Sequence, residues 1–193
     1  MRLSSLMAAA AACLLVLACA PAAGAANGVN VDLTAQLQGS YTSTNDLGSV
    51  VFNFNQRAFS QLAPGTATGR ADRLFSDTRT IAASGTENLD LAGTLTDPFG
   101  ATLTFVKVKA IYIKAAAANT NNVCVGGHAT AAFTGPFSDV TDIICIPPGG
   151  VLMLVHPGAG WTVTATTGDM LKVTNSSSGT GVTYDVLILG TSA

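Results

Sequence analysis

The sequence predicts an all-β protein, folded as a jelly-roll-like antiparallel β-sandwich. Charged residues make up only 10% of the 193 residues, against roughly 25% in an ordinary soluble domain. Hydrophobic residues make up 48% and there are 20 glycines, so the polar surface falls to Thr, Ser, Asn and Gln. This mixture favours short strands and tight turns over helices, which prefer Glu, Lys, Gln and Leu. The length predicts one domain, large enough to fold without a metal or a disulfide.

Residues 1–26 are typical of a secretory leader. Arg2 precedes an apolar run over residues 6–20, and the small residues Ala23-Gly24-Ala25 fit a cleavage site. The run is too short for a stable membrane span, and no other segment is apolar enough to cross a bilayer. We therefore assign residues 27–193 to a single β-sandwich domain.

Two alternatives remain open for the N-terminus. Val16-Leu17-Ala18-Cys19 resembles a bacterial lipobox, in which Cys19 would become the acylated first residue, although leucine is not the preferred residue at its second position. The other alternative is a start assigned too early, with the working protein beginning near Val29.

The pattern changes abruptly after the leader. Strict alternation of apolar and polar residues over 29–37 predicts a half-buried strand. The polar segment 39–48 predicts a turn, and residues 50–54 form the next apolar run, which continues toward Phe59. The segment 63–72 contains one proline and two glycines and predicts a long surface loop.

Short strands then follow at regular intervals. The predicted strands are residues 74–82, 88–92, 102–115, 123–125, 129–133, 142–146, 151–155, 161–166, 170–174 and 182–189. Turn clusters separate them, among them residues 97–100, 126–127, 147–150, 157–160 and 176–181. This spacing, without helical periodicity, predicts a sandwich or a barrel.

The strand predicted over residues 102–115 is the most strongly patterned. It is rich in Val, Ile, Phe and Tyr, so we expect it to be central in its sheet. Lys107 and Lys109 share a face with Phe105 and Ile111, and we therefore expect part of that face to reach solvent.

Recognised catalytic and cofactor motifs are absent from the sequence, including GxSxG, the Walker loop, GxGxxG, HExxH and CxxC. His128 and His156 each lie beside a turn, and a metal site there would need a carboxylate supplied by the fold. Trp161 is more typical of a packing anchor than of a sugar platform, since aromatic residues make up only 6%. We predict no catalytic, cofactor-binding or metal-binding residue, and no enzymatic activity.

Two pairs of aspartates are nominal candidates for a paired-carboxylate site. They are Asp139 with Asp142 and Asp90 with Asp97. Each lies near a turn or a strand end, so solvation of these ends explains them more simply.

The charge balance argues against a nucleic-acid partner. Without Arg2 the chain carries 8 basic residues, one fewer than the 9 of the whole chain, against 11 acidic ones, a net charge of −3. Four arginines fall between residues 57 and 79, but Asp72 and Asp77 lie among them and no aromatic ladder accompanies them.

Cys124 and Cys145 are the only cysteines beyond the leader. An even pair in an exported domain predicts one disulfide. Both lie in short apolar strands, so two buried free thiols are the alternative.

Several segments of the chain share a recurring pattern of strands and turns. They are residues 77–81 (DTRTI), 89–100 (LDLAGTLTDPFG), 103–113 (LTFVKVKAIYI), 147–150 (PPGG), 160–161 (GW) and 184–190 (YDVLILG). Over residues 29–193 this pattern resembles the virion structural proteins of tailed bacteriophages, of the auxiliary head, decoration or fibre type.

The resemblance implies a non-enzymatic β-sandwich that is displayed on a capsid or tail. It implies a homo-oligomer, commonly a trimer, with other virion proteins as partners and the virion as location. A cleaved leader counts against it, because virion proteins assemble in the cytoplasm. The alternative is an exported bacterial binding domain, secreted or periplasmic, for glycans or a cell-surface partner.

The low charge predicts self-association on separate grounds. With few Lys and Glu to guard its strands, a monomeric sandwich would present edges that invite pairing. Burial of these edges and neutral faces against sister subunits removes that liability, and closed cyclic symmetry is then expected.

Overall fold

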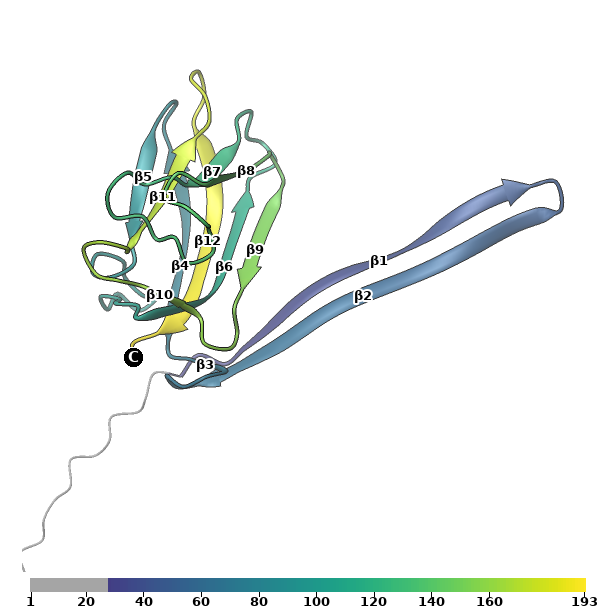
Figure 1. The fold of residues 1–193 in the computed structure, drawn as a ribbon. Coiled ribbons are helices and arrows are strands. Elements are labelled where there is room, and N and C mark those ends of the chain that lie inside the picture. Colours follow the sequence, from purple (N-terminus) through teal and green to yellow (C-terminus); the bar gives the residue numbers. More distant parts are fainter. Residues whose placement is uncertain (1–27) are drawn as a thin grey trace, which may run out of the picture.

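A computed structural model describes residues 28–193, and all of their regular structure is β-strand (Figure 1). None of these residues lies in a helix, and hence none in a helix that could span a membrane. The strands are β1 (Val31–Asn45), β2 (Gly48–Pro64), β3 (Arg70–Ala71), β4 (Arg73–Ile81), β5 (Thr86–Asp90), β6 (Lys107–Ala115), β7 (Val123–Gly126), β8 (Ile143–Ile146), β9 (Val151–Val155), β10 (Trp161–Thr162), β11 (Met170–Asn175) and β12 (Val182–Thr191). The leader and Cys19 lie outside the described residues.

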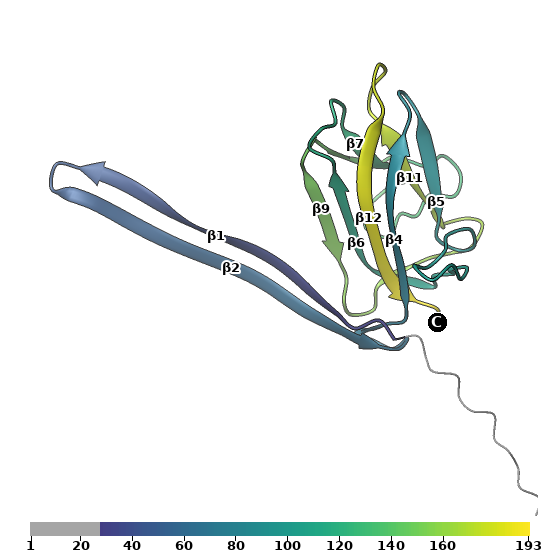
Figure 2. The same cartoon turned by 180° about the vertical axis from the view of Figure 1, so that it is seen from behind.

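Two antiparallel sheets form a sandwich, which confirms the predicted all-β, antiparallel sandwich class (Figures 1 and 2). Sheet I has the order β9-β6-β12-β4, with the short β10 also paired to β6, and sheet II has the order β5-β11-β7-β8. The pairs are nested along the chain: β4 pairs with β12, β5 with β11, β6 with β9 and β7 with β8. The chain therefore winds as one long hairpin: the strands β4 to β7 run out in order, and β8, β9, β11 and β12 return beside them in reverse order.

The core lies between the two sheets and follows from alternation in the strands. In β11 every second residue is buried, and in β12 the same alternation holds over residues 182–186. Burial of each such Val, Leu or Ile side chain stabilises the fold by about 1.5–3 kcal/mol. The largest fully buried side chains of this core are Tyr184, Phe105, Leu89, Leu91, Ile111, Ile113, Leu171 and Ile188.

Part of the face of β6 that carries Lys107 and Lys109 was expected to reach solvent; Lys107 is half-buried and does so, whereas Lys109 is buried. The register between β6 and β12 shifts between Leu189 and Gly190, and Lys109 is the additional residue of the resulting β-bulge. Its side chain is only 2% exposed, and its ammonium group donates a hydrogen bond to the carbonyl of Gly158. Burial and then the charge of Lys107 lower the pKa of Lys109. Alternation could not reveal this burial, because a bulge interrupts the alternation.

Two predicted strands are largely absent, and a third is shorter than predicted. Residues 129–133 form no strand, although Ala132 makes an isolated bridge to Met170. Only the first two residues of 161–166 pair as β10, and residues 102–106 precede β6 without joining a strand. Buried side chains such as Phe133 explain the error, since apolar spacing records burial and not strand pairing.

Residues 31–64 form a hairpin arm that projects from one end of the sandwich (Figures 1 and 2). The 15 residues of β1 pair without interruption with β2, which gives a length of about 50 Å at 3.4 Å per residue. The turn predicted over 39–48 is much shorter than predicted: residues 39–45 continue β1, and the chain reverses only at Asp46 and Leu47. Turn-forming residues are held in a strand here because a partner of equal length satisfies their backbone groups.

The expectation of a half-buried strand over 29–37 holds only at the base of the arm. Leu33 is 7% exposed, whereas Leu37 is 67% exposed. The loop predicted over 63–72 is also shorter, because β2 continues to Pro64 and residues 70–71 pair with its end as β3.

A second, smaller core fixes the base of the arm to the outside of sheet I. The arm contributes Val31, Leu33 and Leu62 to this cluster. Sheet I contributes Leu74, Ala110, Met153 and Leu189, and Val29 and Ala71 complete it. The base of the arm is thus an integral part of the fold, whereas the rest of the arm projects beyond it.

Candidate interaction surface

The arm has one apolar face and one polar face, because strand residues alternate between the two sides of a pair. The apolar face holds the cross-strand pairs Val31–Leu62, Leu33–Ser60, Ala35–Ala58, Leu37–Gln56, Gly39–Phe54, Tyr41–Phe52 and Ser43–Val50. The polar face holds Asp32–Gln61, Thr34–Phe59, Gln36–Arg57, Gln38–Asn55, Ser40–Asn53, Thr42–Val51 and Thr44–Ser49. The apolar face is continuous with the small core at the base, since Leu33 and Leu62 belong to both.

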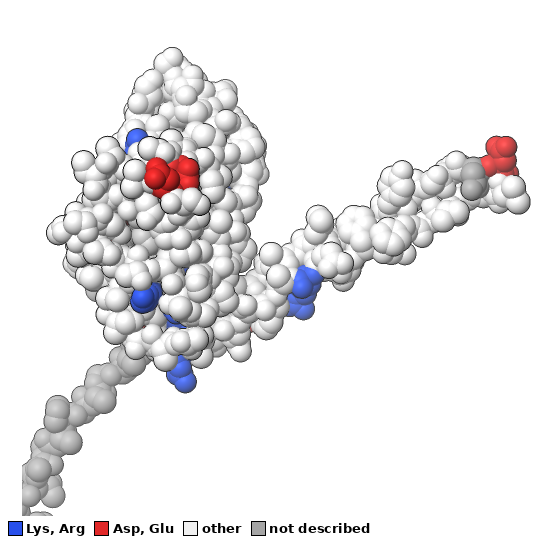
Figure 3. Space-filling model, in the orientation of Figure 1, with Lys and Arg blue, Asp and Glu red and all other residues white. Residues whose placement is uncertain are grey.

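Most of the apolar face is exposed. Tyr41 is 71% exposed, Leu37 67%, Phe52 66% and Val50 62%, and Leu47 at the tip is fully exposed. The side of the arm seen in Figure 3 is uncharged except for a positive patch along its length and a negative patch at its tip. An uncovered patch of this kind marks an interaction site in soluble proteins.

Gly39 has a specific role in the apolar face. A Cβ atom at this position would lie 2.7 Å from the ring of Phe54, so the aromatic ring occupies the space above the glycine backbone. This cross-strand cover explains why Gly39 lies in the middle of a long strand without interrupting it.

Amide side chains stabilise the polar face. Gln36 donates hydrogen bonds to Gln38 at 3.0 Å and to Asn55 at 3.1 Å, and Gln61 donates to Asp32 at 3.1 Å. The polar face is therefore suited to contact with water, in contrast to the apolar face.

The edges of the sandwich differ in charge on its two sides. β4 carries Arg73, Asp77 and Arg79, and β5 carries Glu87 and Asp90. β8 (IICI) and β9 (VLMLV), the edge strands on the other side, carry no charged residue. Charged side chains are the usual protection of an edge strand. The edge strands β8 and β9 lack this protection.

The outer face of sheet I is apolar near β9. Cross-strand rows place Leu187 beside Tyr112 and Tyr112 beside Met153. Leu187 is 36% exposed, and in β9 Val151 and Val155 are 54% and 37% exposed. Beyond the base of the arm, this part of the sheet has no cover within the described chain.

A polar network joins the two sheets at their charged edges. The hydroxyl of Tyr184 donates to one oxygen of Glu87, and Arg79 Nε donates to the other at 2.8 Å. Arg79 also donates to Asp77 at 2.9 Å. Burial and then the hydrogen bond to Glu87 raise the pKa of Tyr184 far above its ordinary value. The network fixes β5 against β4 and β12, and its tyrosine stays protonated at neutral pH.

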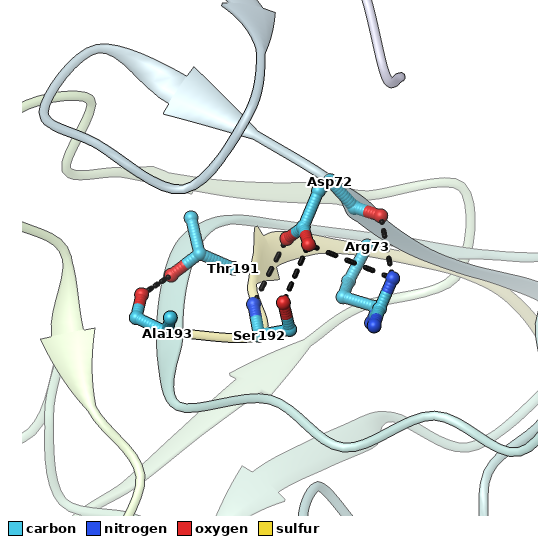
Figure 4. A network of polar contacts seen from close by, with 5 residues as sticks. All are labelled: Asp72, Arg73, Thr191, Ser192 and Ala193. Atoms are coloured by element: carbon cyan, nitrogen blue, oxygen red, sulfur yellow. Dashed lines mark hydrogen bonds and ion pairs between the residues drawn. The ribbon is translucent and has the colours of Figure 1, made fainter. Parts of the chain in front are cut away.

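A second network fixes the C-terminus beside the root of the arm (Figure 4). Asp72, between β3 and β4, accepts hydrogen bonds from the backbone N–H of Ser192 at 2.9 Å and from its hydroxyl at 2.5 Å. Arg73 lies 3.5 Å from the same carboxylate. Residues 28–31, 72–74 and 97–103 line an adjacent groove of about 610 Å³. These contacts tie the end of β12 to the segment from which the arm departs.

The structure places the remaining candidate residues in local roles. Asp142 accepts backbone hydrogen bonds from Ser138 and Asp139, and Asp139 accepts two from Thr141, which lower the pKa of Asp139. Asp90 and Asp97 likewise accept backbone N–H groups within their own turns.

His128 and His156 also accept backbone hydrogen bonds beside their turns, from Ala131 and Gly160. Trp161 packs against the core, with its ring edge-on to His156 at 5.5 Å between centroids. Among residues 28–193 no group of three or more His, Cys, Asp or Glu side chains could hold a metal ion.

Cys124 and Cys145 lie opposite each other in the pairing of β7 with β8 and form a disulfide, with α-carbons 4.0 Å apart. The disulfide ties the uncharged edge strand β8 to sheet II.

The sequence analysis did not predict the exposed half of the arm. The apolar residues at 37, 41, 50 and 52, which lie on both sides of one short turn, were the sequence signal for it.

Comparison of the chain with protein-family models, with curated proteins and with solved structures gave no match.

Proposed function

We propose that this chain is a non-enzymatic structural protein that assembles into homo-oligomers, as a capsid decoration or fibre component of a phage-type virion. The exposed apolar face of the arm carries the proposal. A two-stranded hairpin is marginally stable in water by itself, and this one exposes Tyr41, Leu37 and Phe52 along a face without charge. Such a surface is stable and soluble when a partner covers it.

The winding of the sandwich supports this class of function. The nested pairs, from β4 with β12 inward to β7 with β8, have the order of a jelly roll, and we assign the sandwich to that class. Jelly rolls build viral capsid proteins and lectins. Because a fold alone does not specify a function, the arm and the uncharged β8/β9 side favour assembly.

Light scattering on the full chain, at micromolar concentration and physiological salt, tests the proposal. We expect a closed oligomer, with a trimer as the first expectation, whose mass is unchanged between 0.15 and 1 M salt because the face of the arm that it covers is uncharged. A monomer under these conditions would remove the assembly function.

The disulfide favours a second candidate, an exported domain that binds glycans or a cell-surface partner. Disulfides persist in oxidising compartments and are rare in the cytoplasm, and Cys124 is bonded to Cys145 here. A monomer that binds members of a glycan array would support this candidate, and a virion-associated oligomer would exclude it.

A further inference from the structure

We propose that the apolar face of the arm of one copy packs on the outer face of sheet I of a second copy, next to β9. This inference rests on the proposed homo-oligomer and identifies the two surfaces that would meet in it.

The base of the arm already makes this contact within one chain. Leu33 and Leu62, on the apolar face of the arm, pack with Ala110 and Leu189 on the outside of sheet I. The arm and the sheet are therefore complementary in chemistry where they do meet. Farther along the arm, the same face continues with Leu37, Tyr41 and Phe52 but no longer has a sheet beneath it.

The matching surface is the part of sheet I that the base of the arm leaves uncovered. The row next to Leu189 contains Leu187 and Tyr112, and it continues to Met153, which already contacts the small core at the base of the arm. Val151 and Val155 extend the surface along β9. β9 lies at the edge of the sandwich nearest the arm in both views (Figures 1 and 2), yet the distal part of the arm extends away from it. The arm of the same chain cannot cover this surface in that position, whereas the arm of a neighbouring copy can reach it.

The area and the charge of the arm fit such an interface. The receiving surface is apolar around Leu187 and Tyr112, and its charged residues, Lys114 and Asp185, lie in one row with Val151. Leu37, Tyr41, Val50 and Phe52 are 62–71% exposed, so together they offer roughly 500 Å². That is more than half of the roughly 800 Å² per partner in a stable interface, and the small residues of the same face add to it. Beyond its base, the apolar face has no charged side chain, so its burial requires no desolvation of charge.

The contact is heterologous, since an arm meets a sheet and not another arm. Each copy would then give one arm and receive one, and a rotation that closes yields a ring. A trimer satisfies this geometry without leaving an arm uncovered.

Lysine pairs on the two faces of the arm provide the test. The double variant Y41K/F52K changes the apolar face, and T42K/V51K places the same two charges on the polar face, one pair nearer the tip. We expect Y41K/F52K to weaken association at least about 30-fold, because it would bury unpaired charge, and T42K/V51K to associate like the unmodified chain. Circular dichroism of both variants checks that the sandwich remains folded.

A sheet variant distinguishes this contact from arm-to-arm pairing. V151K/L187K changes the receiving surface, and T80K, on the exposed far end of β4, serves as its control. We expect V151K/L187K to be monomeric, and its mixture with Y41K/F52K to form dimers and no larger species, because one intact arm and one intact sheet remain. An oligomeric V151K/L187K protein would overturn the arm-to-sheet contact, whereas a monomeric unmodified chain would overturn the proposed assembly function itself.

Discussion

Removal of one hydroxyl group, in the variant Tyr184→Phe, tests how the two sheets are held together. Tyr184 is fully buried, and its hydroxyl donates to the carboxylate of Glu87 across the sandwich. A hydrogen bond to a charged group contributes about 1.5–3 kcal/mol to stability. Glu87 keeps 21% of its side chain exposed, so water can replace part of the lost bond, and we expect a loss at the low end, about 1.5 kcal/mol.

The assay is urea unfolding at pH 7, in which the midpoint should fall while the slope stays constant. Tyr112→Phe, on the outer and partly exposed face of the same sheet, is the matched control and should change stability by less than about 0.5 kcal/mol. Equal stability of Tyr184→Phe and the unmodified chain would refute the idea that this bond joins the sheets.

The same residue predicts a loss of stability in alkali. Burial and the hydrogen bond raise the pKa of Tyr184 above the ordinary value of 10.0. Below pH 10 the tyrosine is protonated in both states. As the pH rises above 10, the unfolded chain releases the proton and the folded chain keeps it, so stability falls by up to about 1.4 kcal/mol per pH unit. Tyr184→Phe should lose this part of the slope, and absorbance titration of the folded unmodified chain should show a tyrosine that ionises well above pH 10 and is missing from Tyr184→Phe. Ionisation of Tyr184 near pH 10 in the folded protein would contradict the burial.

Three further perturbations follow from the packing. Reduction of the Cys124–Cys145 disulfide opens a loop with a sequence separation of 21 residues, and we expect a loss of roughly 3 kcal/mol in thermal or urea unfolding; an unchanged midpoint after reductant would show that the bond does not constrain the chain. Gly190→Ala should prevent folding or cost more than about 4 kcal/mol, because the new Cβ would lie 2.1 Å from a backbone oxygen of β6; a native circular dichroism spectrum with normal stability would refute this. Asp72→Ala removes the acceptor of both Ser192 hydrogen bonds and should cost about 1–3 kcal/mol, whereas Asp72→Asn should retain part of that stability.

Local pattern was sufficient for several strands of the sandwich. The segments 74–82, 151–155, 170–174 and 182–189 match β4, β9, β11 and β12 to within two residues at each end. Alternation determines β11 and much of β12, because each has one face in the core and one outside, so the burial of each residue follows from its position. β9 was located by its continuous apolar run between turns. Turn chemistry between them fixed the spacing, and low charge with abundant Thr, Ser and Gly determined the all-β class.

Prediction of the arm required information that no local sequence pattern contains. Residues 39–45 have the composition of a turn, and they are a strand because β2 lies opposite them over its whole length. The exposure of Leu37 depends on the direction in which the arm leaves the sandwich, which the cluster around Leu33 and Leu189 sets.

By itself, the sequence determined the fold class, most strand positions and the absence of familiar catalytic motifs, because these depend on composition and on the period of two along the chain. Only the tertiary structure decided that Lys109 is buried at a bulge, that the edges of β4 and β5 are charged while those of β8 and β9 are not, and that an apolar face of the arm is left uncovered. These properties arise from which strands become neighbours. The whole chain decides these neighbours, since the nested pairs join segments more than a hundred residues apart, as in the Thr78–Asp185 bond with its separation of 107 residues.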